Sequence, residues 1–189
     1  EQQGRLGSDV RVALDHCTDP GAPRAVQEDA VENTVAWASR AKAAHDRTAD
    51  APGRRALLFG VVQGGNHADL RRACVERLVA LGVDGLGFGG WPVTKDAVGL
   101  VAAAAPPHLP LWALGVGSPA RVAEAYGLGY RIFDCTLPTR DARRGRLFVP
   151  APGGSAAGPS AYLYLEDARH RADPRPLDET CDCPACRSH

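Results

Sequence analysis

Three of the six cysteines crowd into one short run, Cys181-Asp182-Cys183-Pro184-Ala185-Cys186. Thiolates bind zinc, and a Cys-x-Cys-x-x-Cys spacing lets short turns aim three of them at one tetrahedral ion. The alternative is a tail with three unpaired thiols, but chance rarely produces such clustering. We therefore predict a Zn²⁺ site that includes Cys181, Cys183 and Cys186. A structural zinc takes four ligands, and His189 is near enough in sequence to be one candidate for the fourth.

A second group of polar and glycine residues follows short apolar runs that are typical of buried strands. Asp15 follows the first run, Gln63 the second, Gly89 and Gly90 the third, and Asp134 the fifth. A carboxylate at such a position can act as a nucleophile or as an acid or base. The expected strands cover residues 10–14, 57–62, 85–88, 111–115 and 130–133.

Helical patterns separate these strands, at residues 25–45, 68–81, 94–104 and 119–126. The alternation predicts an α/β fold with a parallel sheet. Both an open doubly wound sheet and a closed (β/α)₈ barrel fit. A barrel gathers the ends of all its strands around one mouth, whereas an open sheet concentrates function at one switch point, so we favour the barrel. Five strands would be its later part, and the absence of Met also suggests a piece of a longer protein.

Bulk composition restricts the function only weakly. The chain has 22 basic and 22 acidic residues, so net charge gives no argument for a nucleic-acid partner. No apolar run is long enough to span a membrane, and the cysteine pattern suits a reduced, cytoplasmic protein. We place the barrel portion at residues 1–150, and a flexible connector with the start of the zinc subdomain at residues 151–189.

Several motifs together resemble those of the tRNA-guanine transglycosylase family. Phe133-Asp134-Cys135-Thr136-Leu137-Pro138-Thr139-Arg140 combined with the cysteine run is the most specific. The others are Leu6-Gly7-Ser8-Asp9-Val10, Phe59-Gly60-Val61-Val62-Gln63-Gly64-Gly65, Gly115-Val116-Gly117-Ser118-Pro119 and Pro176-Leu177-Asp178-Glu179.

The resemblance implies a (β/α)₈ TIM barrel with a C-terminal zinc subdomain, whose fourth zinc ligand is a His beyond the last Cys. It also implies an enzyme of queuosine biosynthesis. Such an enzyme exchanges guanine at the anticodon wobble position of tRNA for a 7-deazaguanine base, and a homodimer is one assembly to expect. The nucleophile that forms the covalent ribosyl intermediate would be Asp134. The family's acid/base aspartate lies in a Ser-Gly-Gly-Phe motif that this chain does not contain.

For recognition of the base, the resemblance points to Asp9, Gln63, Gly64, Gly89 and Gly90. A carboxylate can accept both N1–H and N2–H₂ of guanine, and glycine permits close approach of the backbone. The alternatives are an aspartate that merely starts a strand and a plain Gln-Gly-Gly turn.

Arg140 and Arg143 match the family's Pro-Thr-Arg-x-x-Arg pattern, which implies contact with RNA. A solvated basic loop is the alternative.

Two departures from the family suggest an altered incoming base. Lys95 occupies a position where bacterial members keep a Glu, and Arg11 replaces a small or apolar residue. Positive charge there would repel an aminomethyl substituent and suit a neutral group such as the nitrile of a 7-cyano-7-deazaguanine. Two further alternatives are exchange on DNA and a catalytically silent, RNA-binding partner subunit.

Overall fold

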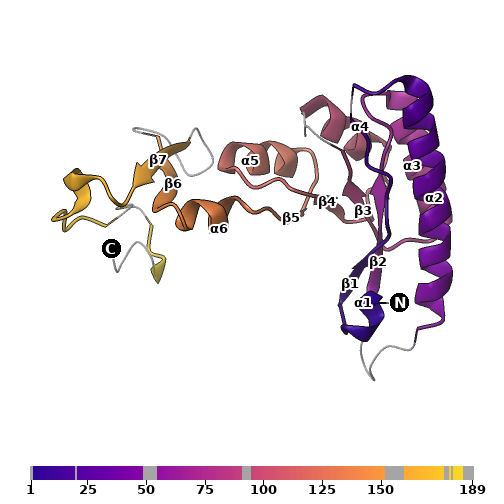
Figure 1. The fold of residues 1–189 in the computed structure, drawn as a ribbon, viewed down its shortest axis with the longest axis horizontal. Coiled ribbons are helices and arrows are strands. Elements are labelled where there is room, and N and C mark those ends of the chain that lie inside the picture. The colour runs from indigo at the N-terminus through magenta and orange to yellow at the C-terminus, as the bar shows by residue number, and fades with distance from the viewer. Residues whose placement is uncertain are drawn as a thin grey trace. The chain divides into compact units, whose positions relative to one another are not determined.

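The computed structural model describes residues 2–19, 21–48, 55–90, 95–151, 160–176, 179 and 181–184. Within these ranges the chain forms two compact units. The first comprises residues 1–116 and 124–134, and the second comprises residues 117–123 and 135–189. Figure 1 shows the ribbon with its elements labelled.

A five-stranded parallel sheet forms the centre of the first unit. Its strands are β1 (Val10–Val12), β2 (Leu57–Val62), β3 (Gly85–Phe88), β4 (Leu111–Ala113) and β5 (Ile132–Phe133). They are hydrogen-bonded in the order β1-β2-β3-β4-β5. A doubly wound sheet reverses its strand order at a switch point, whereas a barrel adds each strand beside the last. The sequential order therefore fits part of a (β/α)₈ barrel and confirms the predicted α/β class.

Helices α2 (Arg24–Asp46), α3 (Ala68–Ala80) and α4 (Lys95–Ala104) connect the first four strands. Helices α2 and α3 pack against β2 and against each other, and Figure 1 shows them side by side along one face of the sheet. The packing is close where Gly60 of β2 meets Leu78 of α3. A Cβ at Gly60 would lie 3.0 Å from a Leu78 methyl group. Leu78 is fully buried, and burial of such a side chain contributes about 1.5–3 kcal/mol.

The outer edge of β1 is hydrogen-bonded to a side chain. Helix α1 (Gln2–Arg5) presents Gln3, whose amide nitrogen donates to the carbonyl of Val12 at 2.8 Å. In return, the Val12 N–H donates to the Gln3 side-chain oxygen at 2.8 Å. The amide thus serves as a local strand partner for β1.

The second unit contains helix α6 (Leu137–Ala142) and an antiparallel hairpin of β6 (Arg146–Pro150) and β7 (Ser160–Tyr164). The short helix η1 (Ala168–His170) follows, capped by Asp167. Helix α5 (Pro119–Gly127) links β4 to β5 and contributes to both units. The hairpin joins residues on both sides of position 150, where the sequence suggested a domain boundary. Most of the predicted connector, residues 152–159, lies outside the described residues.

No helix in the described ranges has the length and apolar character needed to cross a bilayer.

Candidate active site

Asp15 and Gln63 meet where β1 and β2 end. The Gln63 amide nitrogen donates to a carboxylate oxygen of Asp15 at 2.5 Å, and the Gln63 side chain is almost fully buried. The strands of a parallel sheet all end at the same edge, so this pair lies at the edge where a barrel presents its chemistry. A primary amide has two N–H donors, so one remains for another acceptor.

The structure does not bring Asp9 to this pair, and the base-recognition role that the resemblance implies for Asp9 stays a prediction. Asp9 precedes β1, and its backbone carbonyl accepts from the N–H of Leu57, the first residue of β2. Gln63 follows the last residue of β2, so the two lie about 20 Å apart at a strand rise of ~3.3 Å per residue. The alternative that we left open, an aspartate at the start of a strand, describes the position of Asp9.

The loop that carries Asp15 is held by helix α2. Thr34 accepts a hydrogen bond from the His16 N–H at 2.9 Å. Gln27 donates to the Asp19 carbonyl at 2.7 Å and accepts from the Thr18 hydroxyl at 2.8 Å. Gln27 and Thr34 are both fully buried. Because these bonds are anchored on two fully buried side chains, they restrain the loop and with it the Asp15 carboxylate.

Gly89 and Gly64 leave space that the site needs. A Cβ at Gly89 would lie 2.5 Å from the Gln63 amide nitrogen, so any larger residue would displace that side chain. Gly64 has φ of +135°, a conformation that favours glycine, and a Cβ there would lie 2.8 Å from the Arg71 backbone nitrogen. Both predicted glycines are therefore required by the packing around Gln63 and Arg71.

Arg71 of α3 is a buried residue that the sequence analysis did not single out. Its guanidinium donates to the carbonyls of Val62 at 2.6 Å, Gly89 at 2.7 Å and Gly65 at 2.9 Å. It also lies 4.6 Å from the centroid of the Phe88 ring. Burial lowers the pKa of Arg71 to about 10, so the side chain keeps its charge near neutral pH. One side chain thus ties together the loops that follow β2 and β3.

Two neighbouring groups extend this arrangement. A Cβ at Gly90 would lie 3.0 Å from Nη2 of Arg71 and 4.0 Å from the Gln63 side-chain oxygen, so Gly90 adjoins both residues. Cys74 accepts a hydrogen bond from the Gln63 backbone N–H at 3.4 Å. Burial raises the pKa of the Cys74 thiol to about 11, which suits a packing role rather than reactivity.

Asp134 lies at the same edge of the sheet, just after β5. Its Oδ1 accepts from the indole N–H of Trp112 at 2.8 Å and from the Gly115 backbone N–H at 3.3 Å. The Trp112 ring in turn meets Phe59 edge to face, with centroids 6.0 Å apart. Both donors bond Oδ1 of Asp134, and Asp134 is exposed, so its Oδ2 can face a substrate. The sequence analysis did not identify Trp112 as a partner of Asp134.

The family model described as queuine tRNA-ribosyltransferase matches residues 1–189 of the chain. The chain belongs to this family. A queuine tRNA-ribosyltransferase of Azotobacter vinelandii is 40% identical over 98% of the chain, which covers 47% of that protein. Relatives with the same name in Solidesulfovibrio magneticus and Sorangium cellulosum are 38% and 40% identical over 98% of the chain and are covered over 48% and 45% of their length. The chain therefore spans about half the length of the curated relatives that it matches.

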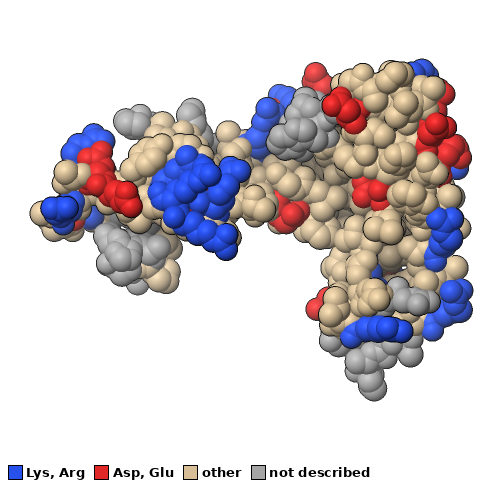
Figure 2. All heavy atoms as spheres, viewed as in Figure 1, with Lys and Arg blue, Asp and Glu red and all other residues tan. Residues whose placement is uncertain are grey.

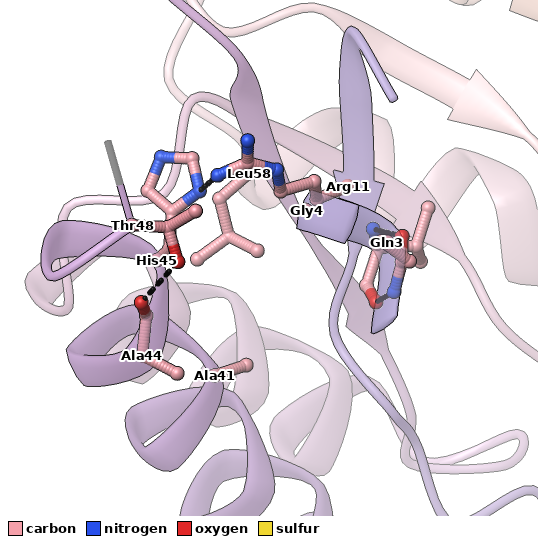
Figure 3. A pocket seen from close by; sticks show the side chains of 9 residues that line it. Gln3, Gly4, Arg11, Ala41, Ala44, His45, Thr48 and Leu58 are labelled. Atoms are coloured by element: carbon pink, nitrogen blue, oxygen red, sulfur yellow. Dashed lines mark hydrogen bonds between the residues drawn. The ribbon is translucent and has the colours of Figure 1, made fainter. Parts of the chain in front are cut away.

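The two departures from the family's pattern occupy different surroundings. Arg11 points toward helix α2, where its Nη1 lies 3.2 Å from Nδ1 of His45, in a pocket of about 60 Å³ (Figure 3). Arg11 therefore lies on the helix-facing side of β1, which corrects the suggestion that it lies near the incoming base. Lys95 starts α4 and forms an ion pair with Glu124 at 3.8 Å.

The family's arginine pattern falls on α6 of the second unit. Arg140 and Arg143 are exposed, at the end of the helix and just after it. Asp141, between them, is buried. Its Oδ1 accepts from Arg146 at 2.6 Å and lies 3.8 Å from the guanidinium of Arg140. The hydrogen bond from Arg146 holds the pKa of the Asp141 carboxyl below its usual range. Asp141 thus fixes one arginine, while Arg140 and Arg143 remain open to solvent.

The predicted zinc ligands are only partly described. Cys181 is exposed and Cys183 partly exposed, whereas Cys186 and His189 lie outside the described residues. No three His, Cys, Asp or Glu side chains within the described ranges form a metal-binding group. The described thiols have the donor chemistry that zinc prefers, at the close spacing of structural sites.

Proposed function

We propose that the whole protein containing this chain is a tRNA-guanine transglycosylase, which exchanges guanine at the anticodon wobble position for a 7-deazaguanine. The observation that carries the proposal is the pairing of Asp15 with Gln63 at the sheet edge that also holds Asp134. This edge carries a paired carboxylate and amide that can hydrogen-bond a base, and it carries a second, oriented carboxylate that can attack the sugar. tRNA as the substrate would place the enzyme in the cytoplasm.

In the proposed mechanism, Asp134 attacks C1′ of the target nucleotide and guanine departs with the electrons of the glycosidic bond. A covalent ribosyl-aspartate results, and the incoming base then attacks the same carbon and releases Asp134. Two displacements retain the configuration at C1′. Trp112 and Gly115 hold one oxygen of Asp134, so the other can be aligned on the sugar carbon. The departing base needs a proton, and the resemblance assigns that task to an aspartate of a motif absent from this chain.

We assign recognition of the base to Asp15 rather than Asp9. The Asp15 carboxylate can accept N1–H and N2–H₂ of guanine, while the second amide hydrogen of Gln63 can reach O6. A 7-deazaguanine presents the same edge, so the same pair of side chains can bind both the departing and the incoming base.

Base exchange by the full-length protein tests this proposal, measured as the entry of radiolabelled guanine into unfractionated tRNA. Asp134→Ala is expected to abolish it. Asp15→Asn loses hydrogen bonds to a charged acceptor, worth about 1.5–3 kcal/mol, so kcat/KM for guanine falls about 10- to 100-fold. Asp9→Asn is the matched control, because it alters the same residue type at the opposite end of β1, and it should leave exchange unchanged. A loss with Asp9→Asn and none with Asp15→Asn would contradict the assignment.

The nature of the incoming base is a separate proposal, and it rests on Lys95 alone now that Arg11 faces α2. A positive charge near position 7 disfavours an aminomethyl group and favours a nitrile. Competition between the two deazaguanines for guanine exchange tests it, and equal uptake would refute it. Label that enters duplex DNA instead of tRNA would support the DNA alternative, and no exchange by a zinc-loaded protein would support a silent subunit.

We also propose that Cys181, Cys183 and Cys186 hold a structural Zn²⁺ together with a fourth ligand. The ion would cross-link the C-terminal segment and take no part in the chemistry.

A further inference from the structure

The second unit carries an aromatic face that the proposed exchange chemistry does not use. In the hairpin of β6 and β7, Arg146 lies opposite Tyr164 and Phe148 opposite Tyr162. Residues two apart on a strand share a face, so these four side chains share one side of the hairpin, which we call the tyrosine face. Tyr162 and Tyr164 are 40% and 51% exposed, so part of each ring is open to solvent.

The rings of the tyrosine face are in mutual contact. Phe148 and Tyr162 have centroids 4.7 Å apart, and Tyr162 and Tyr164 have centroids 6.3 Å apart. The guanidinium carbon of Arg146 lies 4.7 Å over the Tyr162 ring. Because each ring is braced by its neighbours, the face presents aromatic surface at a reduced entropic cost of ordering.

The tyrosine face is continuous with the basic end of α6. The buried Asp141 bonds Arg146 on the tyrosine face and lies within 3.8 Å of Arg140 on the helix. Arg143 and Arg144 follow on the exposed turn. Figure 2 shows a large group of basic atoms over α6 and β6.

The charge of this region is not balanced locally. Residues 140–146 contain four arginines and one aspartate. Farther along, Arg169 pairs with Asp167 and Arg175 with Asp173. The excess of positive charge is therefore concentrated beside the tyrosine face.

We propose that the tyrosine face stacks unpaired bases of single-stranded RNA, beyond the RNA contact that the family's pattern implies for Arg140 and Arg143; this deepens the proposed function and rests on it. Unpaired bases would stack on Tyr164 and Tyr162, and phosphates would contact Arg143 and Arg144. Double-stranded RNA hides its base faces, whereas single strands offer them to aromatic side chains. A net positive surface beside exposed rings favours this polyanion over a protein segment.

The test measures RNA binding by the full-length protein at two salt concentrations, with an anticodon stem-loop and an RNA duplex of equal length as probes. Tyr164→Ser is expected to weaken stem-loop binding about 5- to 100-fold, the range for loss of one base–aromatic stack, and to leave duplex binding unchanged. Tyr164→Phe keeps the ring and should restore binding. Tyr126→Ser is the matched control, because Tyr126 is also exposed and has Arg131 over its ring, but belongs to the first unit.

The salt dependence separates stacking from charge. Tyr164→Ser should leave the slope of log K against log[salt] unchanged, whereas Arg143→Gln should reduce it by about 0.7 for a single strand. If Tyr164 had only a structural role, Tyr164→Ser would not weaken stem-loop binding more than duplex binding.

The outcomes distinguish this inference from the proposed function. Unchanged stem-loop binding by Tyr164→Ser, in a protein that exchanges guanine, overturns the inference alone. If Tyr164→Ser leaves stem-loop binding unchanged but alters the molar mass of the protein in solution, the tyrosine face is a contact between two copies of the protein. That outcome also overturns the inference. A wild-type protein that neither binds RNA nor exchanges guanine overturns both.

Discussion

Arg71 provides the most demanding test of the site's architecture. Arg71→Lys keeps the positive charge but replaces a planar fork with a single ammonium on a shorter reach. Arg71 donates to three carbonyls that belong to two different loops. Nη1 of Arg71 donates to Val62 and Gly89, and Nε donates to Gly65. A lysine ends one atom short of Nη1 and has no second nitrogen, so the Gly65 carbonyl loses its donor, at about 1–3 kcal/mol, and the bonds to Val62 and Gly89 are weakened. Loss of the contact with Phe88 adds about 0.5–2 kcal/mol.

These losses should fall on base binding rather than on RNA binding. The carbonyls belong to Val62, Gly65 and Gly89, which lie around Gln63, so the position of the Gln63 side chain becomes less fixed when the donor is lost. We expect the KM for guanine to rise at least about 10-fold at saturating tRNA, given that 1.4 kcal/mol corresponds to a factor of ten. The KM for tRNA should stay within about twofold of the wild-type value.

Steady-state exchange with each substrate varied in turn measures both values, and thermal unfolding measures the loss of stability. Arg72→Lys is the matched control, because Arg72 is the exposed neighbour on the same helix. If Arg71→Lys unfolds the protein, Gly89→Ala is the second variant: its methyl group meets Gln63 and Val61 while Arg71 is kept, and the KM for guanine should again rise without a change in the KM for tRNA. Wild-type guanine KM and an unchanged melting temperature in Arg71→Lys would refute the reasoning.

The remaining predictions concern the nucleophile and the zinc. Trp112→Phe removes the indole donor to Asp134 but keeps an aromatic ring against Phe59, so kcat should fall about 5- to 50-fold with little change in the melting temperature. An unchanged kcat would show that the Gly115 N–H suffices. Cys181→Ser should reduce bound zinc, measured by elemental analysis, and lower the melting temperature, and Cys74→Ser is the matched control that should retain the metal. Full zinc in Cys181→Ser would exclude Cys181 as a ligand.

The five strands could be predicted because each is an apolar run that ends in glycine or a polar residue. In β2, Leu57–Val62, nearly every residue is buried, as expected for a parallel strand covered on both faces. The hairpin was harder to predict. Arg146–Pro150 carries a charge and a proline, and its pairing with Ser160–Tyr164 depends on contacts that no local pattern encodes.

For Asp9 and Asp15, the family motif and the position in the sheet favour different residues for base recognition. Both flank the same strand, and in a parallel sheet the residue that follows the strand lies at the functional edge. That rule alone selects Asp15. The resemblance gave weight to the motif that contains Asp9, and the position of Gln63 beside Asp15 is what leads us to propose Asp15 instead.

Arg71 could have been found from helical periodicity. Arg71, Cys74, Val75 and Leu78 occupy positions i, i+3, i+4 and i+7, which form one stripe, and all four are buried. A charge within an otherwise apolar stripe indicates a buried cation that needs partners. Its three acceptors are backbone carbonyls, which carry no sequence signal, so its role required the structure.

Side chains of the helices hold the loops that carry Asp15 and Gln63. Gln27 and Thr34 of α2 hold the loop after β1, and Arg71 of α3 joins the loops after β2 and β3. Asp134 is held differently, by Trp112 of β4 and by Gly115 just after it. Since no described hydrogen bond links these two sets of supports, substitutions in α2 or α3 should change guanine binding and leave the reactivity of Asp134 intact. Changes around β4 should do the reverse, so that recognition of the base and attack on the sugar can vary separately on one sheet edge.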